Sequence, residues 1–188
     1  MQSLEKKGPT TRADITIRTG SMRDIDLLIE IDNDASMLFE HAGMSLDPQS
    51  DREVEDAERS RWTQCLAAGT VQVAVSPSGR DVGFAALGLR DGAPFLDQLS
   101  VRVSAMRQGI GTELLYGSIR MAERAGGRAI WLTTYNHLSW NRPYYERQGF
   151  TPVVFEECGE ELRREILFER RYLPCPQERV VMRRDLSI

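Results

Sequence analysis

Apolar residues near the start of the chain first alternate with polar ones and then recur at helical spacing. Residues 15–18, Ile-Thr-Ile-Arg, alternate as a half-buried strand does. The helical spacing follows at Ile25, Leu28, Ile29, Met37 and Leu38. Ser21 or Asp24 can cap this helix, and a second helix is predicted over 51–68, where Gly69 ends it. We expect the loop between the two helices to border a substrate pocket.

Short runs of strand character occupy the middle of the chain. Residues 71–75 and 82–89 are separated by the turn sequence Ser-Pro-Ser-Gly-Arg-Asp, which predicts a hairpin. A second turn containing glycine precedes another predicted strand over 94–103. The pattern therefore predicts three consecutive antiparallel strands.

The second half of the chain alternates between helical and strand patterns. Helical spacing appears at Ile110, Leu114, Leu115, Ile119 and Ala122, before a stop at Gly126-Gly127. Later elements are predicted over 129–134 (strand), 140–149 (helix), 150–155 (strand), 160–171 (helix) and 180–183 (strand). This order predicts a mixed α/β fold with helices on both faces of one sheet.

Length and composition fit one globular domain. The chain has 188 residues, with 41% hydrophobic and 28% charged, values typical of a soluble domain. Residues 1–12 are polar and aperiodic, so we expect a tail there and a single domain over 13–188. No window approaches the ~20 apolar residues of a membrane helix, and the start lacks the apolar core of a secretory signal. We expect a cytoplasmic protein without a membrane partner.

Charge and cysteine content exclude further classes. The net charge of −4 and pI near 5.3 lack the basic surface of a nucleic-acid-binding protein. Cys65, Cys158 and Cys175 are an odd number without C-x-x-C spacing, so neither a disulfide framework nor a zinc site is predicted. We expect reduced thiols and no metal.

A glycine-containing loop is the strongest chemical signal. Residues 106–112, Met-Arg-Gln-Gly-Ile-Gly-Thr, join a strand to a helix, where free backbone N–H groups can hold an anion. A Walker loop would need Lys-Ser/Thr where Thr112-Glu113 stands, and a dinucleotide fingerprint would need glycine at Leu114. Both phosphate loops are excluded. A tight turn without a ligand stays open as the alternative.

Two blocks resemble one enzyme family. Residues 96–101, Leu-Asp-Gln-Leu-Ser-Val, followed by 107–112 are similar to the acetyl-CoA-binding segment of GCN5-related N-acetyltransferases. Residues 140–150, Trp-Asn-Arg-Pro-Tyr-Tyr-Glu-Arg-Gln-Gly-Phe, resemble the tyrosine-containing helix of the family, especially in a bacterial subgroup with Trp-Asn-x-Pro before the tyrosine. The resemblance spans 14–185. Met106 departs from it, because the family usually has Arg or Gln there.

The resemblance implies an acyl-CoA N-acyltransferase fold, a mostly antiparallel sheet in which the fourth and fifth strands splay apart. These strands would be 94–103 and 129–135, with main-chain groups of Leu99 and Val101 offered to the pantetheine arm. The implied reaction is direct attack of a primary amine on acetyl-CoA. The pyrophosphate would lie against Arg107, Gln108, Gly109, Ile110, Gly111 and Thr112. Asn141 would either orient the co-substrate or cap the short helix.

Proton transfers suggest catalytic candidates. An amine of pKa ~10.4 is almost fully protonated at pH 7, so a base is needed. Asp97 is the candidate for this base. The alternative is that Asp97 is a surface aspartate without a catalytic role. Glu30, Glu40 and His41 are rivals that we expect to border the acceptor pocket.

The departing thiolate needs an acid, and a tyrosine hydroxyl has a suitable pKa of ~10. Tyr145 is the candidate. We expect adjacent Tyr144 to face away and to serve packing, since consecutive helical residues do not share a face.

The acceptor is expected to be a small-molecule amine or a peptide amine. Acidic residues between 24 and 40 would attract a cationic acceptor, or they form a solvated helix face. A homodimer is expected by analogy with the family. The alternatives are a non-catalytic acyl-CoA-binding or regulatory module and a transferase that uses another acyl-CoA.

Overall fold

A computed structural model describes residues 14–187, in which one seven-stranded sheet has the order β1-β2-β3-β4-β5-β7-β6. The strands are β1 (Thr16–Thr19), β2 (Val71–Val75), β3 (Asp81–Arg90), β4 (Ala93–Val101), β5 (Ala129–Tyr135), β6 (Thr151–Val153) and β7 (Arg179–Asp185). The α-helices are α1 (Ile25–His41), α2 (Pro48–Ala67), α3 (Ile110–Arg124), α4 (Arg142–Arg147) and α5 (Glu160–Tyr172). The predicted tail over 1–12 lies outside the described residues.

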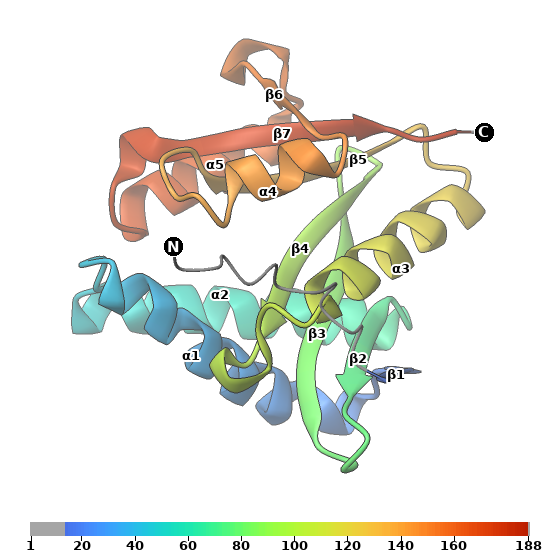
Figure 1. Cartoon of the computed structure of the whole chain (residues 1–188). Coiled ribbons are helices and arrows are strands. Elements are labelled where there is room, and N and C mark those ends of the chain that lie inside the picture. Colours follow the sequence, from blue (N-terminus) through green and yellow to red (C-terminus); the bar gives the residue numbers. More distant parts are fainter. Residues whose placement is uncertain (1–13, 188) are drawn as a thin grey trace, which may run out of the picture.

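Strand pairing confirms the predicted mixed, mostly antiparallel sheet flanked by helices. Neighbouring strands pair antiparallel except β4 and β5, which run parallel and pair only at Phe95 and Trp131. Beyond that point the two strands diverge, as Figure 1 shows near the middle of the sheet. This divergence leaves the facing edges of β4 and β5 without a partner strand.

Alternate residues of β3 point into two different cores because successive strand residues face opposite sides of a sheet. Ala85 and Leu87 belong to the core beneath α3, whereas Phe84 and Ala86 belong to the core beneath α1 and α2. A third core joins α5 to β7 around Ile166. Helices therefore cover both faces, and α1 and α2 lie together on one side of the region where β4 and β5 part (Figure 1).

Several elements begin or end where local chemistry overrides periodicity. Helix α2 starts before the predicted residue 51, because the Asp47 side chain accepts hydrogen bonds from Gln49 N (3.0 Å) and Ser50 N (3.1 Å) and Pro48 suits the first helical position. Strand β6 is shorter than the predicted 150–155. Strand β4 ends before the predicted 103 because Val103–Ala105 form a 3₁₀ turn.

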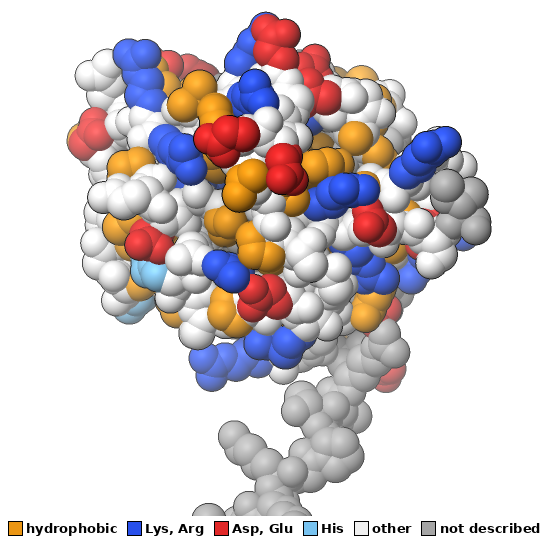
Figure 2. Space-filling view, turned by 90° about the horizontal axis from the view of Figure 1, so that it is seen from above, with side chains coloured by type: hydrophobic (Ala, Val, Ile, Leu, Met, Phe, Trp, Pro, Cys, Tyr) orange, Lys and Arg blue, Asp and Glu red, His pale blue; other side chains and the backbone are white. Residues whose placement is uncertain are grey.

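The outer surface carries mixed charge. On the face in Figure 2, acidic and basic side chains are interspersed with apolar ones, in agreement with a net charge of only −4. Among the helices within 14–187, none combines the length and apolar character needed to cross a membrane.

Candidate active site

A cavity of about 870 Å³ opens where β4 and β5 diverge. Its walls come from both strands, from the loop before α3, and from α1, α2, α4 and α5. Pockets that bind drug-sized ligands span roughly 300–1,000 Å³. A cavity of this volume can therefore hold a ligand of that size. The missing strand pairing therefore creates space that the side chains do not fill.

The loop before α3 turns through two left-handed residues. Arg107 has φ +61° and Gly109 has φ +82°, and such alternation points successive N–H groups into a concave surface that binds anions. Gly109 is the N-cap of α3, where no side chain caps the first turn. The N–H groups of that turn have no carbonyl of their own helix to bond. This backbone geometry is of the kind that can hold an anion.

Most of the predicted loop residues reach the cavity. Its lining includes Arg107, Gly109, Ile110, Gly111 and Thr112, as well as Met106. Gln108 is exposed and faces a separate small hollow beside Ser76 and Arg80. The structure therefore assembles this part of the predicted site with Gln108 as the exception.

Strand β4 brings its own predicted residues to the cavity. Leu99 and Val101 both line it. The register with β3 shifts from the pair Ala86–Gln98 to the pair Leu87–Leu96, which leaves Asp97 as the extra residue of a bulge. Bulges locally redirect side chains and often lie next to active sites. Asp97 is among the residues that line the cavity.

Two adjacent tyrosines of α4 line the same cavity. Tyr145 packs edge-on against Phe150 with ring centroids 5.7 Å apart, and burial raises the pKa of its hydroxyl. The Tyr144 hydroxyl lies 3.4 Å from Thr112 Oγ1, and burial raises its pKa as well. The prediction that Tyr144 faces away is therefore wrong. Successive helical residues point only about 100° apart, so a wide cavity admits both side chains.

Asn141 precedes α4 and lines the cavity. Its main-chain oxygen accepts hydrogen bonds from Tyr144 N (2.9 Å) and Tyr145 N (3.1 Å). Its side chain makes no capping hydrogen bond. Of the two roles considered for this residue, capping by the side chain is thereby ruled out.

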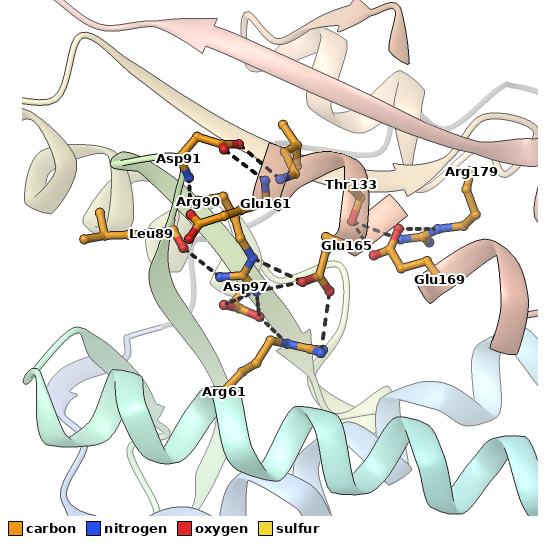
Figure 3. A network of polar contacts seen from close by, with 11 residues as sticks. Arg61, Leu89, Arg90, Asp91, Asp97, Thr133, Glu161, Glu165, Glu169 and Arg179 are labelled. Carbon is orange, nitrogen blue, oxygen red and sulfur yellow. Dashed lines mark hydrogen bonds and ion pairs between the residues drawn. The ribbon is translucent and has the colours of Figure 1, made fainter. Parts of the chain in front are cut away.

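The Asp97 carboxylate is held in a buried ionic cluster (Figure 3). Arg61 Nε of α2 donates to Asp97 Oδ1 at 2.8 Å, and Arg90 Nη2 of β3 lies 3.2 Å from Oδ2. Both arginines also pair with Glu165 of α5, at 3.5 Å and 2.9 Å. The Asp97 side chain is only 2% exposed. Burial raises the pKa of this carboxyl, while Arg90 and Arg61 oppose the rise.

A second buried ion pair lies at the α5 side of the cavity. Arg179 Nη2 is 2.7 Å from Glu169 Oε1, and both residues contact the Thr133 hydroxyl. The Arg179 guanidinium also lies 4.5 Å from the centroid of the Tyr135 ring. The cationic groups of this wall are therefore neutralised by carboxylates of the protein itself.

Two of the three predicted acceptor residues on α1, Glu30 and His41, do not line the cavity. Glu30 pairs with Arg102 at 2.8 Å, and the His41 ring Nδ1 lies 2.6 Å from the Met37 carbonyl oxygen. Neither is among the lining residues, whereas Glu40 is. The consecutive residues Glu40 and His41 thus differ in whether they line the cavity.

Glu58, a carboxylate without a predicted role, lines the cavity. Asp32 lines it as well, and it is one of the acidic residues between 24 and 40 that were predicted either to attract a cationic acceptor or to form a solvated helix face. Asp32 is buried and accepts hydrogen bonds from Gln98 Nε2 and Ser100 Oγ. Glu58 lies on α2 one turn before Arg61. In the sequence, the spacing of three residues between Glu58 and Arg61 indicates that the two side chains share one face of a helix. The spacing does not indicate whether that face borders a cavity.

A family model described as the acetyltransferase (GNAT) family matches residues 32–150. The match covers the loop before α3 and the two tyrosines of α4. It therefore includes the elements that form the cavity on the β4 side.

Solved structures share the fold at low identity. N-acetylglutamate synthase from Neisseria gonorrhoeae, in complex with coenzyme A and N-acetyl-glutamate, has 20% identity and a TM-score of 0.65 over 94% of this chain and 36% of its own. The chain thus spans about a third of that protein. PaiA N-acetyltransferase from Thermoplasma acidophilum, in complex with coenzyme A, has 16% identity and a TM-score of 0.66 over 92% and 99%. A GNAT-family acetyltransferase from Staphylococcus aureus Mu50 has 18% identity and a TM-score of 0.64, with the same coverage.

Proposed function

Because the chain belongs to the GNAT acetyltransferase family, we propose that it transfers an acetyl group from acetyl-CoA to a primary amine. The amine attacks the thioester directly in a ternary complex, without an acyl-enzyme. The acceptor is a small-molecule amine. Two of the solved structures that share the fold are complexes with coenzyme A, which supports the choice of acyl donor.

The divergence of β4 and β5 beside the uncapped start of α3 is the observation that carries this proposal. An extended pantetheine arm can use the unpaired main-chain groups of Leu99 and Val101 as a neighbouring strand would. The N–H groups from Gly109 to Thr112 would hold the pyrophosphate, helped by the positive end of the helix dipole. Side-chain charge would come from Arg107, since Met106 offers none.

Acetyl-CoA supplies an electrophilic acyl carbon on a thiol leaving group. The Val101 N–H would stabilise the oxyanion that forms on attack. The Tyr145 hydroxyl would protonate the departing thiolate. The hydroxyl is protonated at neutral pH, and because burial raises its pKa, it is a weaker acid than a free tyrosine until charge develops beside it.

Asp97 is a candidate base from its place in the cavity wall. Its two oxygens, however, already face Arg61 and Arg90. Two guanidinium groups beside a carboxylate lower its affinity for a proton. These two ion pairs weaken the case for Asp97 as the base.

Calorimetric titration with acetyl-CoA and CoA tests the donor site, with wild type compared to Gly109→Asp. The variant places a carboxylate against the bound phosphates, and we expect micromolar binding to be lost. Gly126→Asp is the matched control. It makes the same change at another open, left-handed glycine, beyond the opposite end of α3.

Retained binding in Gly109→Asp would contradict the placement of the phosphates, and a folded wild type that binds neither compound would contradict the proposed function. Thiol release with 2-phenylethylamine or 1,4-diaminobutane as acceptor separates an enzyme from a non-catalytic acyl-CoA-binding module. Relative turnover of acetyl-, propionyl- and succinyl-CoA measures the acyl preference.

A further inference from the structure

Four cavity carboxylates, Asp32, Glu40, Asp51 and Glu58, have no ion-pair partner in the described part of the chain. Asp32 is hydrogen-bonded to Gln98 and Ser100. Glu40 and Asp51 are exposed, so Glu58 is the partly buried one that is left without a polar partner.

Glu58 lies on α2 three residues before Arg61, a spacing at which an ion pair commonly forms. The Arg61 guanidinium instead points to Asp97 and Glu165, with N–O distances of 2.8 Å and 3.5 Å. Within the described part of the chain, no hydrogen bond or ion pair engages the Glu58 carboxylate.

The charged groups around Glu58 leave it facing an excess of negative charge. Asp32 of α1, Asp97 of β4 and Glu169 of α5 act on it as like charges, and Arg61 opposes them. Arg61 is itself shared between two other carboxylates. An ammonium group that enters the cavity could therefore pair with the Glu58 carboxylate without displacing a cation of the protein.

We propose that Glu58 is the catalytic base, which takes a proton from the ammonium group of the acceptor, and that Asp97 is a positioning residue that holds Arg61 away from Glu58. This inference rests on the proposed function. It assigns the base to α2, whereas the sequence analysis looked for it on β4 and α1.

The proposed step moves one proton to Glu58 and one electron pair to the acyl carbon. The Glu58 carboxylate takes one proton from R–NH₃⁺ and leaves R–NH₂ with a free electron pair. That pair forms the C–N bond, the carbonyl π pair moves to oxygen, and its return breaks the C–S bond. The Tyr145 hydroxyl protonates the thiolate and regains a proton from the attacking nitrogen. Glu58 then releases its proton to solvent, so the products are the amide, the free thiol and one proton.

The acid–base character of Glu58 agrees with this role. Burial and the neighbouring Asp32 raise its pKa well above the ordinary glutamate value, against a smaller lowering by Arg61. A general base works best when its pKa lies near the operating pH. A carboxyl with a raised pKa binds a proton more readily at neutral pH than an ordinary surface glutamate does.

An NMR pH titration of ¹³C-labelled glutamate side chains tests the inference without any turnover. One resonance, absent in Glu58→Gln, is expected to titrate well above the others. In Asp97→Asn, this titration is expected to move to lower pH, because a like charge is lost and Arg61 is freed. A Glu58 that titrates with the surface glutamates would overturn the role of base. An unchanged titration in Asp97→Asn would overturn the positioning role.

Steady-state kinetics with 2-phenylethylamine and 1,4-diaminobutane give the second test. Glu58→Gln is expected to lose roughly 10²-fold or more in kcat at pH 7, to recover as rising pH frees the amine, and to bind acetyl-CoA as wild type does. Glu53→Gln, the same change at an exposed position of α2, is the control. Equal rates in the two variants would overturn the proposal. A wild type that binds acetyl-CoA but acetylates neither amine would contradict the proposed function instead, and the titration would stand as a separate result.

Discussion

The two adjacent tyrosines of α4 have different surroundings, which suit them to different roles in the proposed reaction. Tyr145 is packed between Tyr144 and Phe150, with ring centroids 5.1 Å and 5.7 Å away. Tyr144 instead sends its hydroxyl toward Thr112 at the start of α3. The packing around Tyr145 suits a proton donor held in one position. The position of the Tyr144 hydroxyl suits a contact with bound acetyl-CoA.

Tyr145→Phe is therefore expected to lower kcat by about 10²-fold, within the usual range for a lost acid–base group, with little change in KM for acetyl-CoA. The ring packing stays because only the hydroxyl is removed. Tyr144→Phe is the matched variant and should alter mainly acetyl-CoA affinity. A large kcat loss in Tyr144→Phe together with normal turnover in Tyr145→Phe would reverse the assignment.

At the scale of single elements, the 3₁₀ turn Met22–Asp24 before α1 combines a capping box with an ion pair. Asp24 accepts a hydrogen bond from Ser21 N at 2.7 Å and pairs with Arg18 of β1 at 2.9 Å. The hydrogen bond from Arg18 is the main cause that lowers the pKa of Asp24 to about 2. The ionised carboxylate therefore ties the first strand to the first helix.

A carboxyl whose pKa is lower in the folded state stabilises the fold above its unfolded pKa, and that stability is lost as pH falls toward the folded value. Asp24→Asn removes the charge that pairs with Arg18 and is thus expected to reduce the free energy of unfolding at pH 7 by ~1 kcal/mol. The gap to wild type should close between about pH 4 and pH 2. Urea unfolding at several pH values measures this gap. Asp26→Asn, at a side chain that is 85% exposed, should show almost no effect at any pH.

Periodicity predicted the order of the elements well because burial of one face leaves a strong signal in the sequence. Helix α3 is an example, with Leu114 and Leu115 fully buried. Boundaries were harder because they depend on single side chains. The Asp47 cap starts α2 early, and the bulge at Asp97 is invisible to a pattern that counts only apolar positions.

The candidate site was predictable only where a local motif describes it. The loop before α3 and the tyrosine helix carry contiguous residues whose spacing is itself the signal. Glu58 and Asp32 come from two helices, and a polar residue on a helix usually faces solvent. Which polar positions face the cavity depends on how α1 and α2 lie against the sheet, and this orientation is not encoded in any short segment.

At the scale of the whole molecule, the ligand is expected to complete the sheet where β4 and β5 part. Hydrogen exchange followed by mass spectrometry should then slow on addition of CoA at residues 99–101 and 109–112. Strands β1 and β2 lie at the far edge of the sheet and are expected to exchange unchanged. Uniform protection of the whole sheet, or none in the two segments, would contradict the placement of the donor.

The central claim is direct transfer of the acetyl group to an amine, and intact-mass measurement with product analysis tests it most directly. The protein is mixed with excess acetyl-CoA, first without an acceptor and then with 2-phenylethylamine or 1,4-diaminobutane. We predict an unmodified protein mass in the first sample, and free CoA with an equal amount of acetylated amine in the second. A stoichiometric acetyl adduct on the protein that disappears on addition of the amine would contradict the account, since it would show a covalent intermediate.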